Sequence, residues 1–192
     1  MEVYTTEEQQ VEVIKSWWKE NGTSVLAGTV IGLVGLFGWR YYNELQQTNQ
    51  EAASQAYNAM TAQLAKGDDA ALEQAKSFIS AHQGDAYAEL AALQLAAAAV
   101  KAGKLDLAAE QLTLVAASGD ESIKPIAALR LARVLKDQGK ADEALAQLGK
   151  INNDAFKAQV AEVRGDVLLG QGKPEEARDA YQVAADAGGL QS

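Results

Sequence analysis

Residues 101–112 read KAGKLDLAAEQL, and the tripeptide around Gly103 recurs twice further along the chain. The three copies are Ala102-Gly103-Lys104, Gln138-Gly139-Lys140 and Gln171-Gly172-Lys173, and their glycines are 36 and 33 residues apart. A period of about 34 residues is typical of repeats built from two antiparallel helices. Glycine ends a helix in a left-handed conformation without a steric penalty, so each copy predicts the turn between two helices.

Each of these glycines lies at fixed distances from small and large residues. Small residues precede it by seven positions, alanines follow it by five, and large residues follow it by nine: Ala96, Ala132 and Gly165; Ala108, Ala144 and Ala177; Leu112, Leu148 and Tyr181. Two helices meet closely where a small residue on one leaves a hole that a larger residue on the other fills. The spacing therefore predicts helical hairpins stacked into a short α-solenoid, with a degenerate hairpin around Gly67.

The composition also indicates an all-α protein. Only 6% of the residues are aromatic and two are proline, while alanine, leucine and glutamine recur; this balance favours helix. The chain has no cysteine, which excludes disulfides and thiolate chemistry. Its formal net charge of −9 argues against nucleic acid binding, which needs a basic face.

A second feature is the stretch from Asn21 to Trp39, which contains no charged residue. As a helix its 19 residues would extend about 28 Å, close to the ~30 Å thickness of the bilayer core. Aromatic side chains concentrate at membrane interfaces, and here they flank the stretch on both sides: Trp17, Trp18, Trp39, Tyr41 and Tyr42. The sequence therefore predicts a permanent membrane anchor.

Two alternatives for this stretch fit less well. A cleaved secretion signal needs small residues just beyond the apolar run, where this chain has Trp39, Arg40 and Tyr41. A buried core helix gives no reason for aromatic residues at both ends.

Basic residues near the anchor give a weak indication of orientation. Lys15 and Lys19 precede it and Arg40 follows it, which favours a cytoplasmic N-terminus because positive residues are retained inside. We expect a cytoplasmic tail (1–20), a transmembrane helix (21–39), a helical linker (40–50) and an extracytoplasmic repeat domain (51–192).

Ser24, Gly28 and Gly32 recur every four residues within the anchor. Such a stripe of small residues lets another transmembrane helix approach closely, so we predict a packing face here. The alternative is that glycine is simply common in membrane spans.

The sequence offers little for catalysis. His82 is the only histidine, and the adjacent acidic pairs fall in turns or first helical turns, where carboxylates cap helices. We find no phosphate loop, metal cluster or nucleophile motif. We therefore expect no catalytic, cofactor-binding or metal-binding residues and hold an enzyme as a minor alternative.

Binding is the remaining option, because a solenoid of hairpins offers a concave surface lined by the first helix of each pair. By the repeat register this surface starts apolar and ends charged. Its expected residues are Leu90, Leu93, Ala97, Val100, Ile126, Leu129, Arg133, Lys136, Glu162 and Asp166. The alternative is that part of its apolar portion is internal packing.

The repeats resemble tetratricopeptide repeats, in units of about 89–122, 125–158 and 158–191. They depart from that consensus because alanine replaces the bulky aromatic of the first helix, at Ala92, Ala128 and Ala161. With the tail MEVYTTEEQQVEVIKSWWKENG and the span ending GWRYYNELQ, the chain resembles the YfgM family of ancillary SecYEG translocon subunits.

That resemblance implies a bitopic protein of the bacterial inner membrane with its repeat domain in the periplasm. The implied partners are the SecYEG translocon, the PpiD chaperone and exported polypeptides, and the implied role is a non-enzymatic adaptor or chaperone-like subunit. A regulator of envelope-stress signalling through the cytoplasmic tail is the alternative. Compared with the family, we expect the last repeat to lack its usual cap after Gly189.

Overall fold

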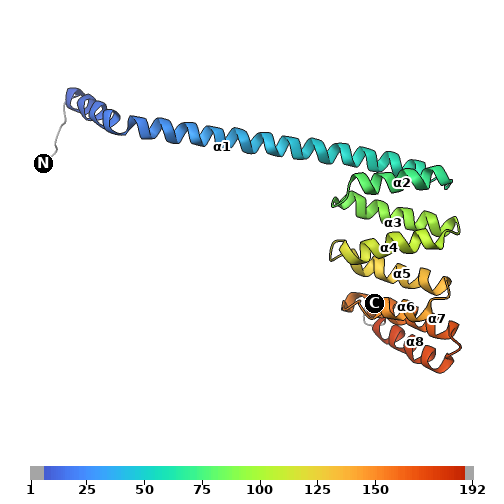
Figure 1. The fold of residues 1–192 in the computed structure, drawn as a ribbon. Coiled ribbons are helices and arrows are strands. Elements are labelled where there is room, and N and C mark those ends of the chain that lie inside the picture. Colours follow the sequence, from blue (N-terminus) through green and yellow to red (C-terminus); the bar gives the residue numbers. More distant parts are fainter. Residues whose placement is uncertain (1–6, 189–192) are drawn as a thin grey trace. The chain divides into compact units, whose positions relative to one another are not determined.

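The computed structural model describes residues 7–188, and every regular element in that range is helical (Figure 1). The expected tail before residue 7 and the expected chain end after residue 188 lie outside the described residues. The elements are α1 (Glu7–Leu64), α2 (Asp69–Ala81), α3 (Ala86–Lys101), α4 (Leu105–Ser118), α5 (Lys124–Asp137), α6 (Ala141–Leu148), the 3-10 helix η1 (Asp154–Phe156), α7 (Lys157–Gly170) and α8 (Pro174–Gly188). They divide into two compact units, Met1–Ala52 and Ala53–Ser192.

The first unit contains the apolar part of α1, the one helix in residues 7–188 that is long and apolar enough to cross a membrane. Only 6% of its most apolar window is buried. A core helix would bury this window, so the exposure disfavours that alternative and fits a transmembrane helix. The flanking aromatic side chains are exposed as well: Trp17, Trp18, Trp39, Tyr41 and Tyr42.

The small-residue stripe lies on one exposed side of α1. Ser24, Gly28 and Gly32 are all exposed, and a Cβ atom added at either glycine would meet no atom within 4 Å. The stripe is therefore accessible to another helix, and its packing role stays a prediction.

The second unit is a stack of antiparallel hairpins. Figure 1 shows α2 to α8 following one another in chain order. The predicted repeats are α3 with α4, α5 with α6, and α7 with α8, and the degenerate hairpin around Gly67 joins the end of α1 to α2. The all-α solenoid predicted from the sequence is confirmed.

The three repeat glycines close their hairpins in the same way. Gly103, Gly139 and Gly172 have φ angles of 72°, 77° and 74°. In the first of these turns the amide of Lys104 donates to the carbonyl of Ala99 at 2.8 Å, and equivalent bonds follow the other two glycines. This bond spanning the helix end is the Schellman motif, which satisfies carbonyls that a helix end leaves unpaired.

The small and large residues of the repeat register make up the core. Ala108, Ala144 and Ala177 are essentially inaccessible to solvent. Ala96 and Leu112 are buried in the first repeat, as are Ala132 and Leu148 in the second. The register read from the sequence therefore places these residues correctly.

The third repeat shows the packing constraint at its tightest. A Cβ atom added at Gly165 would lie 2.5 Å from a carbon of the Tyr181 ring, so the ring occupies the space that a side chain at position 165 would need. The Tyr181 hydroxyl also donates to Asp166 Oδ1 at 2.8 Å. Position 165 is therefore a glycine because the Tyr181 ring is larger than the leucine at the same place in the other two repeats and needs a smaller residue beside it.

Neighbouring hairpins are joined by a recurring polar contact. A turn side chain of each repeat donates to the aspartate in the first turn of the preceding second helix: Lys104 to Asp69 at 2.6 Å, Gln138 to Asp106 at 2.9 Å, and Gln171 to Asp142 at 2.9 Å. All three contacts are exposed, so each contributes little to stability, but they bond one edge of every hairpin to the next.

The contact at Gly165 gives the first prediction. Gly165→Ala should lower the free energy of unfolding by about 1–3 kcal/mol, because overpacking forces neighbouring atoms apart. Denaturant unfolding of the full chain in detergent, followed by circular dichroism, measures this change.

Gly170→Ala is the matched control on the same helix. A Cβ atom at Gly170 meets nothing within 4 Å, so this change should leave stability unchanged or raise it by up to about 1 kcal/mol. In a Tyr181→Leu background, which copies the alanine and leucine pairing of the other repeats, Gly165→Ala should cost far less. Equal costs for Gly165→Ala with Tyr181 or Leu at position 181 would contradict this account.

Candidate functional site

The candidate site is the solvent-facing side of the first helix of each repeat, which we call the first-helix face. It is formed by α3, α5 and α7, and ten residues were predicted for it from the repeat register. The structure places them in three groups. Leu90, Ala97, Val100, Arg133 and Glu162 are exposed; Ile126, Lys136 and Asp166 are half-buried; Leu93 and Leu129 are buried.

The α3 portion of this face is apolar and accessible. The side chains of Leu90 and Val100 are 39% and 40% exposed, and Ala97 lies between them on the same side of the helix. Large aliphatic side chains at helical spacing offer an apolar surface to a partner, although each one by itself is an ordinary surface residue.

The two buried leucines differ from the surface role predicted for them. Leu93 is 9% and Leu129 is 7% exposed, and both belong to the continuous core of the second unit. These two side chains serve internal packing, whereas the binding role of the whole face stays a prediction.

The α5 portion is basic. Arg133 is exposed, and Lys136 Nζ lies 3.6 Å from the carboxylate of Asp137. Arg130, one turn before Arg133, is also exposed and was missed in the sequence-based set. Among residues 7–188 no ion pair is found for either arginine, so both guanidinium groups are available to acidic groups of a partner.

The α7 portion is acidic and partly engaged. Glu162 is exposed, but Asp166 accepts a hydrogen bond from the hydroxyl of Tyr181. This hydrogen bond to Asp166, with a smaller contribution from burial, raises the pKa of Tyr181 above its usual value. Asp166 therefore supports the α7–α8 packing while it borders the first-helix face.

A shallow groove of about 350 Å³ adjoins the α3 portion. It runs between α3 and the last turns of α1, and Ala97 is part of its wall. The side chains of Thr61, Gln94 and Lys101 also line it. Thr61 lies on the degenerate hairpin, whose first helix is the end of α1, and the sequence-based set did not extend the face that far. Gln94 and Lys101 lie on α3 itself but were not among the positions selected from the repeat register.

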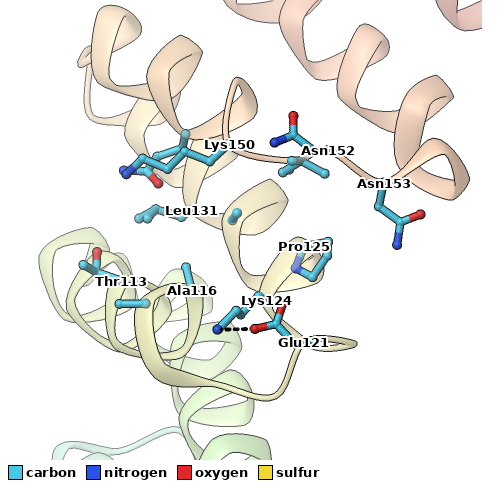
Figure 2. A pocket seen from close by; sticks show the side chains of 13 residues that line it. Thr113, Ala116, Glu121, Lys124, Pro125, Leu131, Lys150, Asn152 and Asn153 are labelled. Atoms are coloured by element: carbon cyan, nitrogen blue, oxygen red, sulfur yellow. Dashed lines mark hydrogen bonds and ion pairs between the residues drawn. The ribbon is translucent and has the colours of Figure 1, made fainter.

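A larger depression of about 570 Å³ lies between α4, α5 and the chain that follows α6, and none of the ten predicted residues lines it. Figure 2 shows Leu131 between its two rims, Thr113 and Ala116 on one and Lys150 and Asn152 on the other. It exists because α6 has only eight residues and ends at Leu148. In the sequence, Gly149 and the pair Asn152-Asn153 indicate that this helix is short. The periodicity of apolar residues does not predict the depression that the short helix leaves.

Few side chains in the described residues could act as catalytic groups or metal ligands. His82 Nδ1 lies 3.3 Å from Asp85 Oδ2, and its ring lies 4.4 Å from that of Phe78. No group of three or more histidine, cysteine or acidic side chains in residues 7–188 could hold a metal ion. The accessible groups of the first-helix face suit the binding of a polypeptide.

Comparisons with known proteins agree with the fold. A family model described as a tetratricopeptide repeat-like domain matches residues 15–192. The chain is similar to the ancillary SecYEG translocon subunit of Escherichia coli (strain K12), with 39% identity over 95% of this chain and 88% of the relative.

Two further relatives carry the same description. That of Haemophilus influenzae is 32% identical over 95% of this chain and 90% of the relative. That of Neisseria gonorrhoeae is 30% identical over 97% of this chain and 90% of the relative. The chain belongs to the YfgM family of ancillary SecYEG translocon subunits, as its tail, span and repeats indicated.

Burial on the first-helix face gives the second prediction. Leu93→Ala should lower the free energy of unfolding by about 2–5 kcal/mol, because it removes a buried side chain and leaves a cavity. Leu90→Ala, one turn away on the same helix, should cost less than about 1 kcal/mol, because its side chain keeps much of its contact with water. Thermal unfolding of the full chain in detergent compares the two, and similar losses would place Leu90 in the core as well.

Proposed function

We propose that this member of the YfgM family acts as a non-enzymatic, membrane-anchored adaptor associated with the SecYEG translocon. The observation that carries this proposal is the similarity to curated ancillary translocon subunits across 95% of the chain. The similarity includes the repeats and the apolar helix, since the matching family model begins at residue 15. Both the anchor and the repeat scaffold are therefore features of the family.

In this proposal the anchor brings the protein to the translocon within the inner membrane. The exposed stripe of Ser24, Gly28 and Gly32 would let a helix of a membrane partner approach the backbone of α1 closely. Close approach supplies the van der Waals contact that drives helix association in lipid, where the hydrophobic effect contributes little.

The proposed orientation has the N-terminus in the cytoplasm and the repeat domain in the periplasm. Lys15 and Lys19 stand before the apolar stretch and Arg40 stands after it, and positive residues near a span favour the cytoplasmic side. This arrangement presents the first-helix face to polypeptides that leave the translocon.

The first-helix face is proposed to hold exported polypeptides before they fold. An unfolded chain exposes apolar side chains, which Leu90 and Val100 can contact, and acidic side chains, which Arg130 and Arg133 can pair with. Contacts of this kind are weak one at a time and release the client readily. A PpiD-like periplasmic chaperone is the proposed partner that receives such clients.

The third prediction concerns the complex itself. Affinity purification of the full chain at native expression, in a mild detergent, should recover the SecYEG components, a PpiD-like chaperone and exported polypeptides, as identified by mass spectrometry. Gly28→Leu with Gly32→Leu should lower the recovery of the membrane partner severalfold, because the bulk keeps the two helix backbones apart.

Val30→Phe is the matched control, because it adds bulk to a different side of the same helix. Its recovery of SecYEG should equal that of the unchanged protein. Purification that captures no SecYEG component at native expression would refute the proposed function, whereas equal losses for the glycine and valine changes would refute only the packing role of the stripe.

A further inference from the structure

The described segment before the membrane span, residues 10–20, is strongly two-sided. Large apolar side chains occupy Val11, Val13, Ile14, Trp17 and Trp18, and all five are exposed. Positions three, four and seven residues apart lie on one side of a helix, so these side chains gather in one arc. Five polar residues form the opposite arc: Glu12, Lys15, Ser16, Lys19 and Glu20. Gln10, at the start of the segment, is the one polar residue of residues 10–20 that falls on the apolar side.

Such a segment is unexpected for a soluble tail. A helix in water would leave five large apolar side chains exposed along less than four turns, and residues 7–52 contain no other element that could cover them. Its polar residues carry both signs of charge, because Lys15 and Lys19 stand among acidic residues. The segment is therefore not a strongly basic tail, and its apolar arc is the feature to explain. The segment has the pattern of a helix that lies at an apolar boundary.

Figure 1 shows the first turns of α1 at an angle to the rest of the helix. Two side-chain contacts at the start of the apolar stretch are of a kind that bends helices. The Asn21 side chain donates from Nδ2 to the Trp17 carbonyl at 3.1 Å, and such bonds compete with the backbone ladder. Gly22 gives room for the Trp18 ring, whose nearest atoms would lie 3.3 Å from a Cβ there.

We propose that residues 10–20 form an interfacial helix whose apolar arc lies in the lipid headgroup region, with a bend at Asn21 and Gly22. The lipid surface is the occupant that the chain itself favours, because the segment is covalently continuous with the membrane span. Within a few residues of the span, an apolar arc reaches the boundary between headgroups and acyl chains. Lys15 and Lys19 extend their charged ends to the headgroups.

This placement gives the two tryptophans a more specific role than flanking the span. The rings of Trp17 and Trp18 lie 6.5 Å apart, at the junction between the segment and the bend. Their amphipathic rings would fix the depth of both helical parts at once. The inference rests on membrane insertion of α1 and is independent of any association with SecYEG.

The fourth prediction uses the absence of cysteine, which makes any introduced cysteine unique. Full-length Val11→Cys, Ile14→Cys, Glu12→Cys and Ser16→Cys variants are labelled with an environment-sensitive NBD dye and reconstituted in vesicles of phosphatidylethanolamine and phosphatidylglycerol. Quenching by a lipid with its doxyl group near the headgroup should be severalfold stronger at positions 11 and 14 than at positions 12 and 16.

Val34→Cys, in the middle of the span, serves as the insertion control and should be quenched best by a doxyl group deep in the acyl chains. Weak quenching at all four N-terminal positions would overturn the proposal in favour of a tail in water. Depth that increases steadily towards the span would overturn it in favour of a straight transmembrane helix. A third outcome is also decisive. If the NBD dyes at positions 11 and 14 are shielded from water only at a high ratio of protein to lipid, and lose this shielding on dilution with excess lipid, the arc packs against a second copy of the chain and the proposal is overturned.

Discussion

The fold of the three repeats depends on one steric constraint: α3, α5 and α7 each carry a small residue where the second helix of the hairpin brings a large one. In the third repeat this is visible directly, because the Tyr181 ring fills the space beside Gly165. The buried alanines and leucines of the other two repeats follow the same register. That register fixes which side of each of these helices turns towards its hairpin partner, and the opposite side is left for neighbouring hairpins and solvent. The first-helix face is therefore a consequence of how the hairpins close.

The features that the sequence predicted best are those set by local sterics. A glycine with positive φ, a small residue seven positions before it and an apolar run without charges each have few structural solutions, so the hairpins, their turns and the membrane helix could be predicted. The positions of Leu93 and Leu129 depend on how closely neighbouring hairpins pack, which a register does not specify. The depression beside α6 depends on a helix length, and the groove beside Ala97 depends on the end of α1 acting as a first helix. Periodicity within a single repeat carries none of this information.

The two units divide the proposed work. The anchor limits the protein to the membrane plane, which raises the local concentration of any partner in that membrane and allows weak contacts to suffice. The repeat domain offers an apolar surface on α3, exposed arginines on α5 and acidic side chains on α7. A mixed surface of this kind favours contact with many unfolded polypeptides over tight binding of one ligand. The proposed interfacial helix would fix the depth and tilt of the anchor at its N-terminal end.

Site-specific photocrosslinking during protein export tests the central claim most directly, because it asks which side of the repeat domain meets polypeptides. A crosslinking amino acid is placed at Val100 on the first-helix face or at Leu114 on a second helix, two positions with side chains that are 40% and 44% exposed. The account predicts that Val100 captures exported polypeptides in cells while Leu114 captures few. Equal capture at both positions, or capture at Leu114 alone, would contradict it.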